Sequence, residues 1–137
     1  FYPLKLKSNP LRKNLGFENL ATKIYDTFIE EKVSKIIFEK RGDISRFNYY
    51  LNKQDSNLKN KIFIKTNSLV PGNFYELNFN YDLINKTKGE KILIVKNVPD
   101  IKETNYNLNE IKFIKSITTK TVQNLKKTYY LYSGEIR

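Results

Sequence analysis

Residues 61–97, KIFIKTNSLVPGNFYELNFNYDLINKTKGEKILIVKN, decide the fold that the sequence predicts. Polar residues separate four large side chains at every second position: Tyr75, Leu77, Phe79 and Tyr81. A period of two places alternate side chains on opposite faces of a strand. A second, more deeply buried strand is indicated by the apolar run at residues 92–95, after a basic loop. We therefore expect a long β-hairpin here, preceded by a turn at residues 71–72.

Outside this hairpin the sequence predicts one packed helix and several short strands. Residues 17–31 carry apolar side chains at spacings of three and four, which is typical of an amphipathic helix. The further expected elements are strands at residues 33–41, 44–51, 61–66, 110–117 and 128–133, a bend at residues 42–43 and a short helix at residues 118–127. This order predicts a mainly β fold of the α+β class. We expect a small barrel or a strongly curved antiparallel sheet, with the N-terminal helix packed on it.

The chain has 137 residues, which is the length of one domain. Residues 1–16, FYPLKLKSNPLRKNLG, contain four basic residues, no acidic residue and two prolines that disfavour regular structure. We interpret them as a basic N-terminal arm, and residues 17–137 as a single globular domain. Because no initiator Met is present, the sequence is expected to be a fragment or a processed form.

The formal net charge of +11 indicates a polyanionic partner, and nucleic acid is the simplest. An alternative stays open, because Lys, Asn, Ile, Phe and Tyr, the residues with A/T-rich codons, together make up more than half of the chain. An AT-rich genome would produce the same excess of lysine without a functional reason.

Missing residue types exclude several classes of site. The sequence contains no Cys and no His, so it has no disulfide, no zinc–thiolate site and no catalytic triad built on His or Cys. No run of 18 apolar residues is present, so no membrane span is expected. No metal site or cofactor is predicted from composition. The cytoplasm is the default location, with a secreted or organellar one left open.

A candidate binding surface comes from the expected strands at residues 44–51 and 61–66. Their alternation places cations and aromatic rings together on one outer face: Arg46, Tyr50, Lys61, Phe63 and Lys65. Bases of a single strand stack on such rings for about 1–3 kcal/mol each, while cations neutralise the phosphates. The alternative is that Tyr50 and Phe63 are buried under the helix.

Across residues 32–117 the strand pattern resembles the OB-fold of single-stranded nucleic-acid-binding proteins. In such barrels the ligand lies across the second and third strands and the adjacent loops. The resemblance implies that the strands at residues 44–51 and 61–66 form the binding face, flanked by a loop with Lys86 and Lys88. Unlike the bacterial single-stranded-DNA-binding family, this chain has no flexible acidic tail.

A second resemblance suggests an enzyme. Pro99-Asp100 followed by Glu110-Ile111-Lys112 is similar to the motif of PD-(D/E)xK nucleases. It implies that Asp100 and Glu110 hold Mg²⁺ and that Lys112 positions or activates water. Candidate supporting residues are Gln123 and Tyr129, on the helix that would follow. The alternative is that these residues are surface charges at strand ends.

Two further alternatives concern a second nuclease-like match and a structural role on RNA. Asp82 and Lys96 form another partial match to the nuclease motif, but Ile94 occupies the position of the glutamate. High lysine content and the basic arm also suit a structural RNA-binding protein of the ribosomal type. Of these alternatives we favour a non-catalytic domain that binds single-stranded DNA or RNA.

Overall fold

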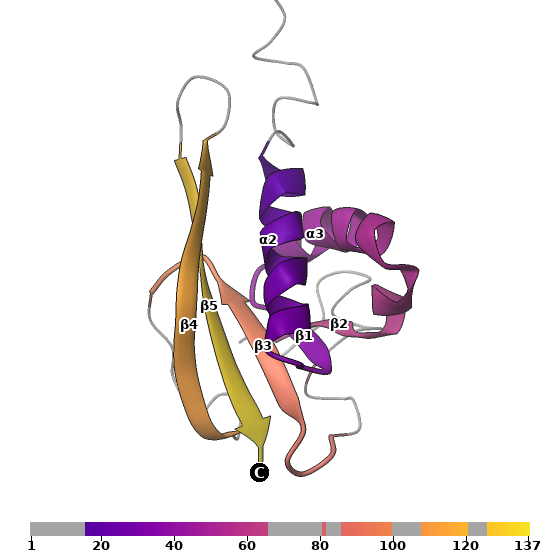
Figure 1. Ribbon diagram of the computed structural model, residues 1–137, viewed down its shortest axis with the longest axis vertical. Helices are drawn as coiled ribbons and strands as arrows, with labels where there is room; N and C mark the ends of the chain where they lie inside the picture. The colour runs from indigo at the N-terminus through magenta and orange to yellow at the C-terminus, as the bar shows by residue number, and fades with distance from the viewer. Residues whose placement is uncertain (1–15, 66–80, 82–85, 100–107, 121–125) are drawn as a thin grey trace, which may run out of the picture.

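A five-stranded mixed sheet with two helices forms the described part of the protein, residues 16–65, 81, 86–99, 108–120 and 126–137 of a computed structural model (Figure 1). The elements in chain order are α2 (Phe17–Glu30), β1 (Lys35–Phe38), α3 (Arg41–Gln54), the 3₁₀ helix η2 (Ser56–Asn60), β2 (Ile62–Ile64), β3 (Lys91–Lys96), β4 (Leu108–Lys120) and β5 (Lys126–Ile136). Neither α2 nor α3 is long and apolar enough to cross a membrane.

The sheet has the strand order β2-β1-β3-β5-β4. β1 lies at the centre of a parallel group, where Ile37 is paired with Phe63 of β2 on one side and with Ile94 of β3 on the other. β5 is antiparallel to both β3 and β4. The antiparallel sheet that we expected is therefore correct only for β3, β5 and β4. Within the described residues the sheet is open, with β2 and β4 at its edges, so the barrel is unconfirmed.

The expected N-terminal helix is confirmed as α2. Its apolar residues recur at helical spacing, and Phe17, Leu20, Ile24 and Phe28 are all buried. The chain enters α2 through Gly16, which has a φ of 94°, and leaves it before Lys32, which has a φ of 54°. Both are left-handed backbone conformations, so they end the helical path at each side.

The strand expected at residues 44–51 and the bend at residues 42–43 are wrong, because both lie in α3. The buried side chains of α3 are Ile44, Phe47 and Leu51, at spacings of three and four. Phe47 and Leu51 also fit a period of two with Tyr49, so the short apolar pattern was ambiguous. Topology resolves the ambiguity: β1 and β2 are parallel neighbours, and a parallel pair needs a crossover, commonly a helix.

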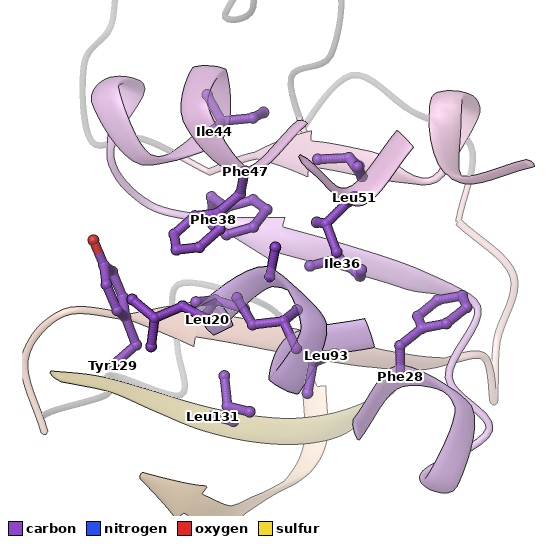
Figure 2. Close-up of a cluster of buried hydrophobic side chains, with 14 of the residues drawn as sticks. Leu20, Phe28, Ile36, Phe38, Ile44, Phe47, Leu51, Leu93, Tyr129 and Leu131 are labelled. Atoms are coloured by element: carbon purple, nitrogen blue, oxygen red, sulfur yellow. The ribbon is translucent and has the colours of Figure 1, made fainter. Parts of the chain in front are cut away.

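Two apolar clusters cover the two faces of the sheet. The cluster beneath α2 and α3 includes Phe38 and Phe47, whose rings are stacked 5.3 Å apart (Figure 2). On the opposite face, Ile37, Ile92 and Ile94 pack with other buried residues that include Tyr81 and Tyr132. Burial on both faces explains why β1 and β3 are continuous apolar runs rather than alternating ones.

The remaining expectations divide into three groups. Strands at residues 33–41, 61–66, 92–95, 110–117 and 128–133 are confirmed, with shifted ends. The short helix at residues 118–127 is wrong where the structure describes it, because Thr118 belongs to β4 and Lys127 to β5. Residues 1–15 of the expected arm and residues 66–80 of the expected hairpin lie outside the described residues, as do Asp82, Asp100 and Gln123.

Candidate nucleic-acid interface

The residues predicted to form one binding face are distributed over different parts of the molecule. Lys61 precedes β2, and Lys86 and Lys88 precede β3, so these three lie toward the amino edge of the parallel strands. Lys65 follows β2 at the opposite edge, where its backbone N–H donates to the Phe38 carbonyl. Arg46 is on α3. The expected face was built on a strand that is a helix, and it therefore does not exist as a continuous surface.

Neither aromatic residue of that expected face is exposed as a stacking surface requires. Phe63 is 8% exposed and belongs to the cluster on the face of the sheet opposite α2 and α3. Tyr50 is half-buried and packs against the cluster beneath the helices. Phe63 is thus buried, as that alternative expected, but on the face opposite α2 and α3 rather than under the helix.

The solvent-facing side of α3 carries a different aromatic residue. Successive side chains of a helix are rotated by about 100°. Because Ile44, Phe47 and Leu51 face the core, Tyr49 is at the centre of the opposite side, and its side chain is 61% exposed. We call the surface around it the α3 outer face, which consists of Ser45, Arg46, Asn48, Tyr49, Asn52 and Lys53.

Tyr49 lies in a shallow hollow of about 430 Å³, lined by four other residues of the α3 outer face: Ser45, Asn48, Asn52 and Lys53. The ring of Tyr50 contacts it edge-on, with centroids 5.1 Å apart and an interplanar angle of 78°. Lys53 Nζ is 5.5 Å from the Tyr49 centroid. Two neighbours thus orient the ring, while most of its surface stays open to solvent.

Three exposed cations lie together near the first turn of α3. We call Lys40, Arg46 and Lys127 the cation cluster; they come from the residue before α3, from α3 and from β5. The positive charge of each acts to lower the pKa of Asp43, which places all three around that carboxylate. The Arg46 Cζ is 5.1 Å and the Lys127 Nζ 5.9 Å from the centroid of the Phe17 ring. Among the described residues, none of the three is in a salt bridge.

Asp43 is itself engaged toward the protein interior. Its Oδ1 accepts a hydrogen bond of 2.8 Å from the hydroxyl of Tyr129, which is 4% exposed. Burial raises the pKa of Asp43 despite the Tyr129 hydrogen bond and the three cations. Burial and the adjacent carboxylate raise the pKa of Tyr129 well above its ordinary value. Three cations therefore share one partly buried carboxylate, which leaves an excess of positive charge at this end of α3.

Other lysines are used inside the fold. Lys35 pairs with Glu90, Lys91 with Glu31 at 3.3 Å, and Lys96 with Glu39 at 3.0 Å. Lys96 is only 8% exposed. These lysines connect neighbouring segments at the ends of the parallel strands. They contribute to the net charge of the chain without offering it to a partner.

The residues of the nuclease alternative are only partly described. Glu110 and Lys112 are both exposed on β4, where they line a small hollow of about 120 Å³ with Lys91 and Glu135. Within the described ranges, no group of three acidic residues is placed to hold a metal ion. Tyr129 lies on β5, rather than on a helix after the motif, and is hydrogen-bonded to Asp43 of α3.

The sequence interpretation missed Tyr49, Lys40 and Lys127. The helical spacing of Ile44, Phe47 and Leu51 was the available signal, since it places Tyr49 on the solvent side. Lys40 and Lys127 have no comparable signal, because only the fold brings β5 next to the start of α3.

No family model matches the chain, and the comparisons with curated proteins and with solved structures found no match. A functional proposal therefore depends on the geometry and chemistry of the chain itself.

Proposed function

We propose that this protein binds single-stranded nucleic acid through the cation cluster and the α3 outer face. The observation that carries the proposal is an exposed aromatic ring, Tyr49, on the same helix as Arg46, one of three clustered cations that have no ion-pair partner among the described residues. Single-strand binding needs both features, because phosphates require cations and unpaired bases require a ring to stack on.

Arg46 connects the two parts of this surface. It belongs to the cation cluster around Asp43, and it precedes Tyr49 by three positions, which is one helical turn. Lys53 follows Tyr49 by four positions on the same side. Its salt bridge with Glu18 is 3.6 Å long and joins two side chains that are more than half exposed, so a phosphate can replace Glu18 at little cost. A single nucleic-acid strand lying along α3 would thus meet Arg46 on one side of the stacked base and Lys53 on the other.

A comparison of two triple variants tests the proposal. Lys40→Gln, Arg46→Gln and Lys127→Gln together remove the cation cluster. Lys61→Gln, Lys86→Gln and Lys88→Gln remove the same charge from the amino edge of the parallel strands. Binding of a labelled DNA strand of about 30 nucleotides would be measured between about 50 and 200 mM salt, with and without Mg²⁺.

We expect the wild type to bind with strong salt dependence and to leave the strand intact. Loss of the cation cluster should weaken binding by about tenfold or more and reduce the salt slope by about 2, since each single-strand phosphate contact contributes about 0.7. Loss of the amino-edge lysines should have a much smaller effect. Equal loss in the two triple variants would show unspecific attraction and overturn the assigned surface. Absence of binding at low salt would overturn the proposed function, and cleavage only with Mg²⁺ would favour the nuclease alternative.

A further inference from the structure

The hollow on the α3 outer face contains two asparagine side chains that the contacts with phosphate do not use. Asn52 Nδ2 donates hydrogen bonds to Asn48 at two places, to its backbone carbonyl at 2.6 Å and to its Oδ1 at 2.9 Å. The two amides therefore hold each other in a fixed arrangement one helical turn apart. Both are half-buried and line the same hollow as Tyr49.

This pairing determines which polar atoms stay available. Asn52 uses its amide nitrogen and Asn48 uses its Oδ1, so Asn52 Oδ1 and Asn48 Nδ2 have no hydrogen-bond partner among the described residues. The hollow thus offers an acceptor and a donor from two adjacent amides. The third small polar residue, Ser45, is already satisfied, because its hydroxyl donates to the Gly42 carbonyl at 3.1 Å.

An adjacent acceptor and donor of amide type complement a base edge that presents an amino donor beside a ring-nitrogen acceptor. Adenine presents N6 beside N7, the pair that Asn or Gln reads in duplex DNA. Cytosine presents N4 beside N3, but adenine has the larger ring system to stack on Tyr49. The ring of Tyr49 supplies the stacking surface beside the amides. Tyr50 holds it from one side, so little further ordering is needed on binding. The volume of about 430 Å³ is within the range of small-molecule sites, about 300–1,000 Å³.

We infer that this hollow is a base-binding subsite selective for adenine, in which Tyr49 stacks on the base while Asn52 accepts from N6 and Asn48 donates to N7. The inference rests on the proposed function and adds to it the identity of the preferred base. The adenine can belong to a DNA or an RNA strand, because no atom of the base edge distinguishes the two. Arg46 and Lys53, on the side of α3 toward α2, are placed for the flanking phosphates.

The test is a comparison of homopolymers of about 20 nucleotides: oligo(dA), oligo(dC), oligo(dT) and oligo(rA). Wild-type protein should bind oligo(dA) about fivefold or more tightly than oligo(dT), the lower end of what a bidentate pair of hydrogen bonds to one base provides. The double variant Asn48→Ala, Asn52→Ala should reduce this ratio to about twofold or less and leave oligo(dT) binding nearly unchanged. Asn19→Ala, which removes an exposed asparagine from α2, is the matched control and should keep the full ratio.

The outcomes separate the subsite from the proposed function. If wild-type protein binds oligo(dC) or oligo(dT) as tightly as oligo(dA), or if the double variant keeps the preference for adenine, the adenine subsite is overturned while nucleic-acid binding stands. If no homopolymer binds at low salt, both fall together. Comparison of oligo(rA) with oligo(dA) shows whether the site prefers RNA or DNA, since the two strands differ only in the sugar. A circular dichroism melt of each variant verifies that it is folded.

Discussion

The hydroxyl of Tyr129 donates a hydrogen bond of 2.8 Å to Asp43 Oδ1 and so connects β5 with the first turn of α3. The two residues are 86 positions apart in the sequence. Phe47 supports the contact, with its ring edge-on to that of Tyr129 at 5.2 Å. This contact fixes where α3 begins relative to the start of β5, and thereby fixes Arg46 relative to Lys127.

Replacing Tyr129 by Phe should lower the free energy of unfolding by about 1–3 kcal/mol, because a partly buried carboxylate loses its neutral donor. Urea denaturation followed by circular dichroism measures this change. Tyr130→Phe is the matched control, since its half-buried hydroxyl makes no hydrogen bond with a described residue. Equal effects of the two substitutions would contradict a specific role for the Tyr129 hydroxyl.

Glu90 should make the stability depend on acid pH. Burial acts to raise its pKa, but hydrogen bonds from Lys35 and Ser34 outweigh burial and hold the pKa below the ordinary value of 4.5. The folded protein therefore binds this proton less readily than the unfolded chain. The contribution to stability is complete above about pH 4.5 and is lost as the pH falls through the lowered pKa of the folded state.

Glu90→Gln should accordingly lower stability at neutral pH and flatten the decline of unfolding free energy below pH 4.5. Urea midpoints measured from neutral to strongly acidic pH would show this. Glu135→Gln, an exposed carboxylate on β5, serves as control. A decline of unchanged steepness in Glu90→Gln would mean that other carboxylates account for it.

Two glycines should respond to alanine in opposite directions. A Cβ on Gly134 would lie 2.9 Å from the Glu110 carbonyl oxygen and 2.7 Å from Leu108 Cδ1. Because that oxygen is part of the β4 backbone, Gly134→Ala should destabilise by about 1–3 kcal/mol. Gly42, in α3, has no heavy atom within 4 Å of the added carbon, and Gly42→Ala should stabilise by up to about 1 kcal/mol. Thermal unfolding of both variants measures these changes, and a shift in the same direction for both would contradict the prediction.

Local pattern predicted the elements whose periodicity has a single interpretation. Phe17, Leu20, Ile24 and Phe28 fit only a helix, and the run at residues 92–95 fits a buried strand, so both predictions were confirmed. The pattern of residues 44–51 fits two periods, and only the parallel pairing of β1 with β2 decides between them. Information on that pairing comes from contacts distant in sequence.

The candidate surface was less predictable than the fold. Charge and aromatic content suggested a partner, but the expected residues depended on treating α3 as a strand, so only Arg46 is shared between the expected face and the surface proposed from the structure. Helical spacing would have exposed Tyr49 and placed Tyr50 toward the core. Lys127 joins the cation cluster through the antiparallel pairing of β5. No local pattern in a single sequence predicts that pairing.

The lysines on β4 should protect an open sheet edge. Among the described strands, β4 pairs only with β5, and its exposed side includes Phe113, which is 56% exposed. Charged residues and irregular pairing are common defences of such edges, and β4 has Lys112, Lys115 and two register shifts. Lys112→Thr with Lys115→Thr should therefore promote self-association, detected by light scattering across a concentration series. Lys86→Thr with Lys88→Thr removes the same charge away from this edge and should leave the molecular mass unchanged; association of both variants would point to charge alone.

Replacing Tyr49 by Ala should weaken nucleic-acid binding, whereas replacing Phe63 by Ala should lower stability. Because the Tyr49 side chain is 61% exposed, Tyr49→Ala should leave unfolding nearly unchanged but weaken single-strand binding by about 1–3 kcal/mol through loss of one stacked base. Phe63 is 8% exposed in the core on the face opposite α2 and α3, so Phe63→Ala should lower the unfolding free energy by about 3–5 kcal/mol. Titration of a labelled strand at a temperature where both variants are folded should then show near wild-type affinity for Phe63→Ala. The reverse result, weak binding by folded Phe63→Ala and full binding by Tyr49→Ala, would exclude the α3 outer face and return the stacking surface to the sheet.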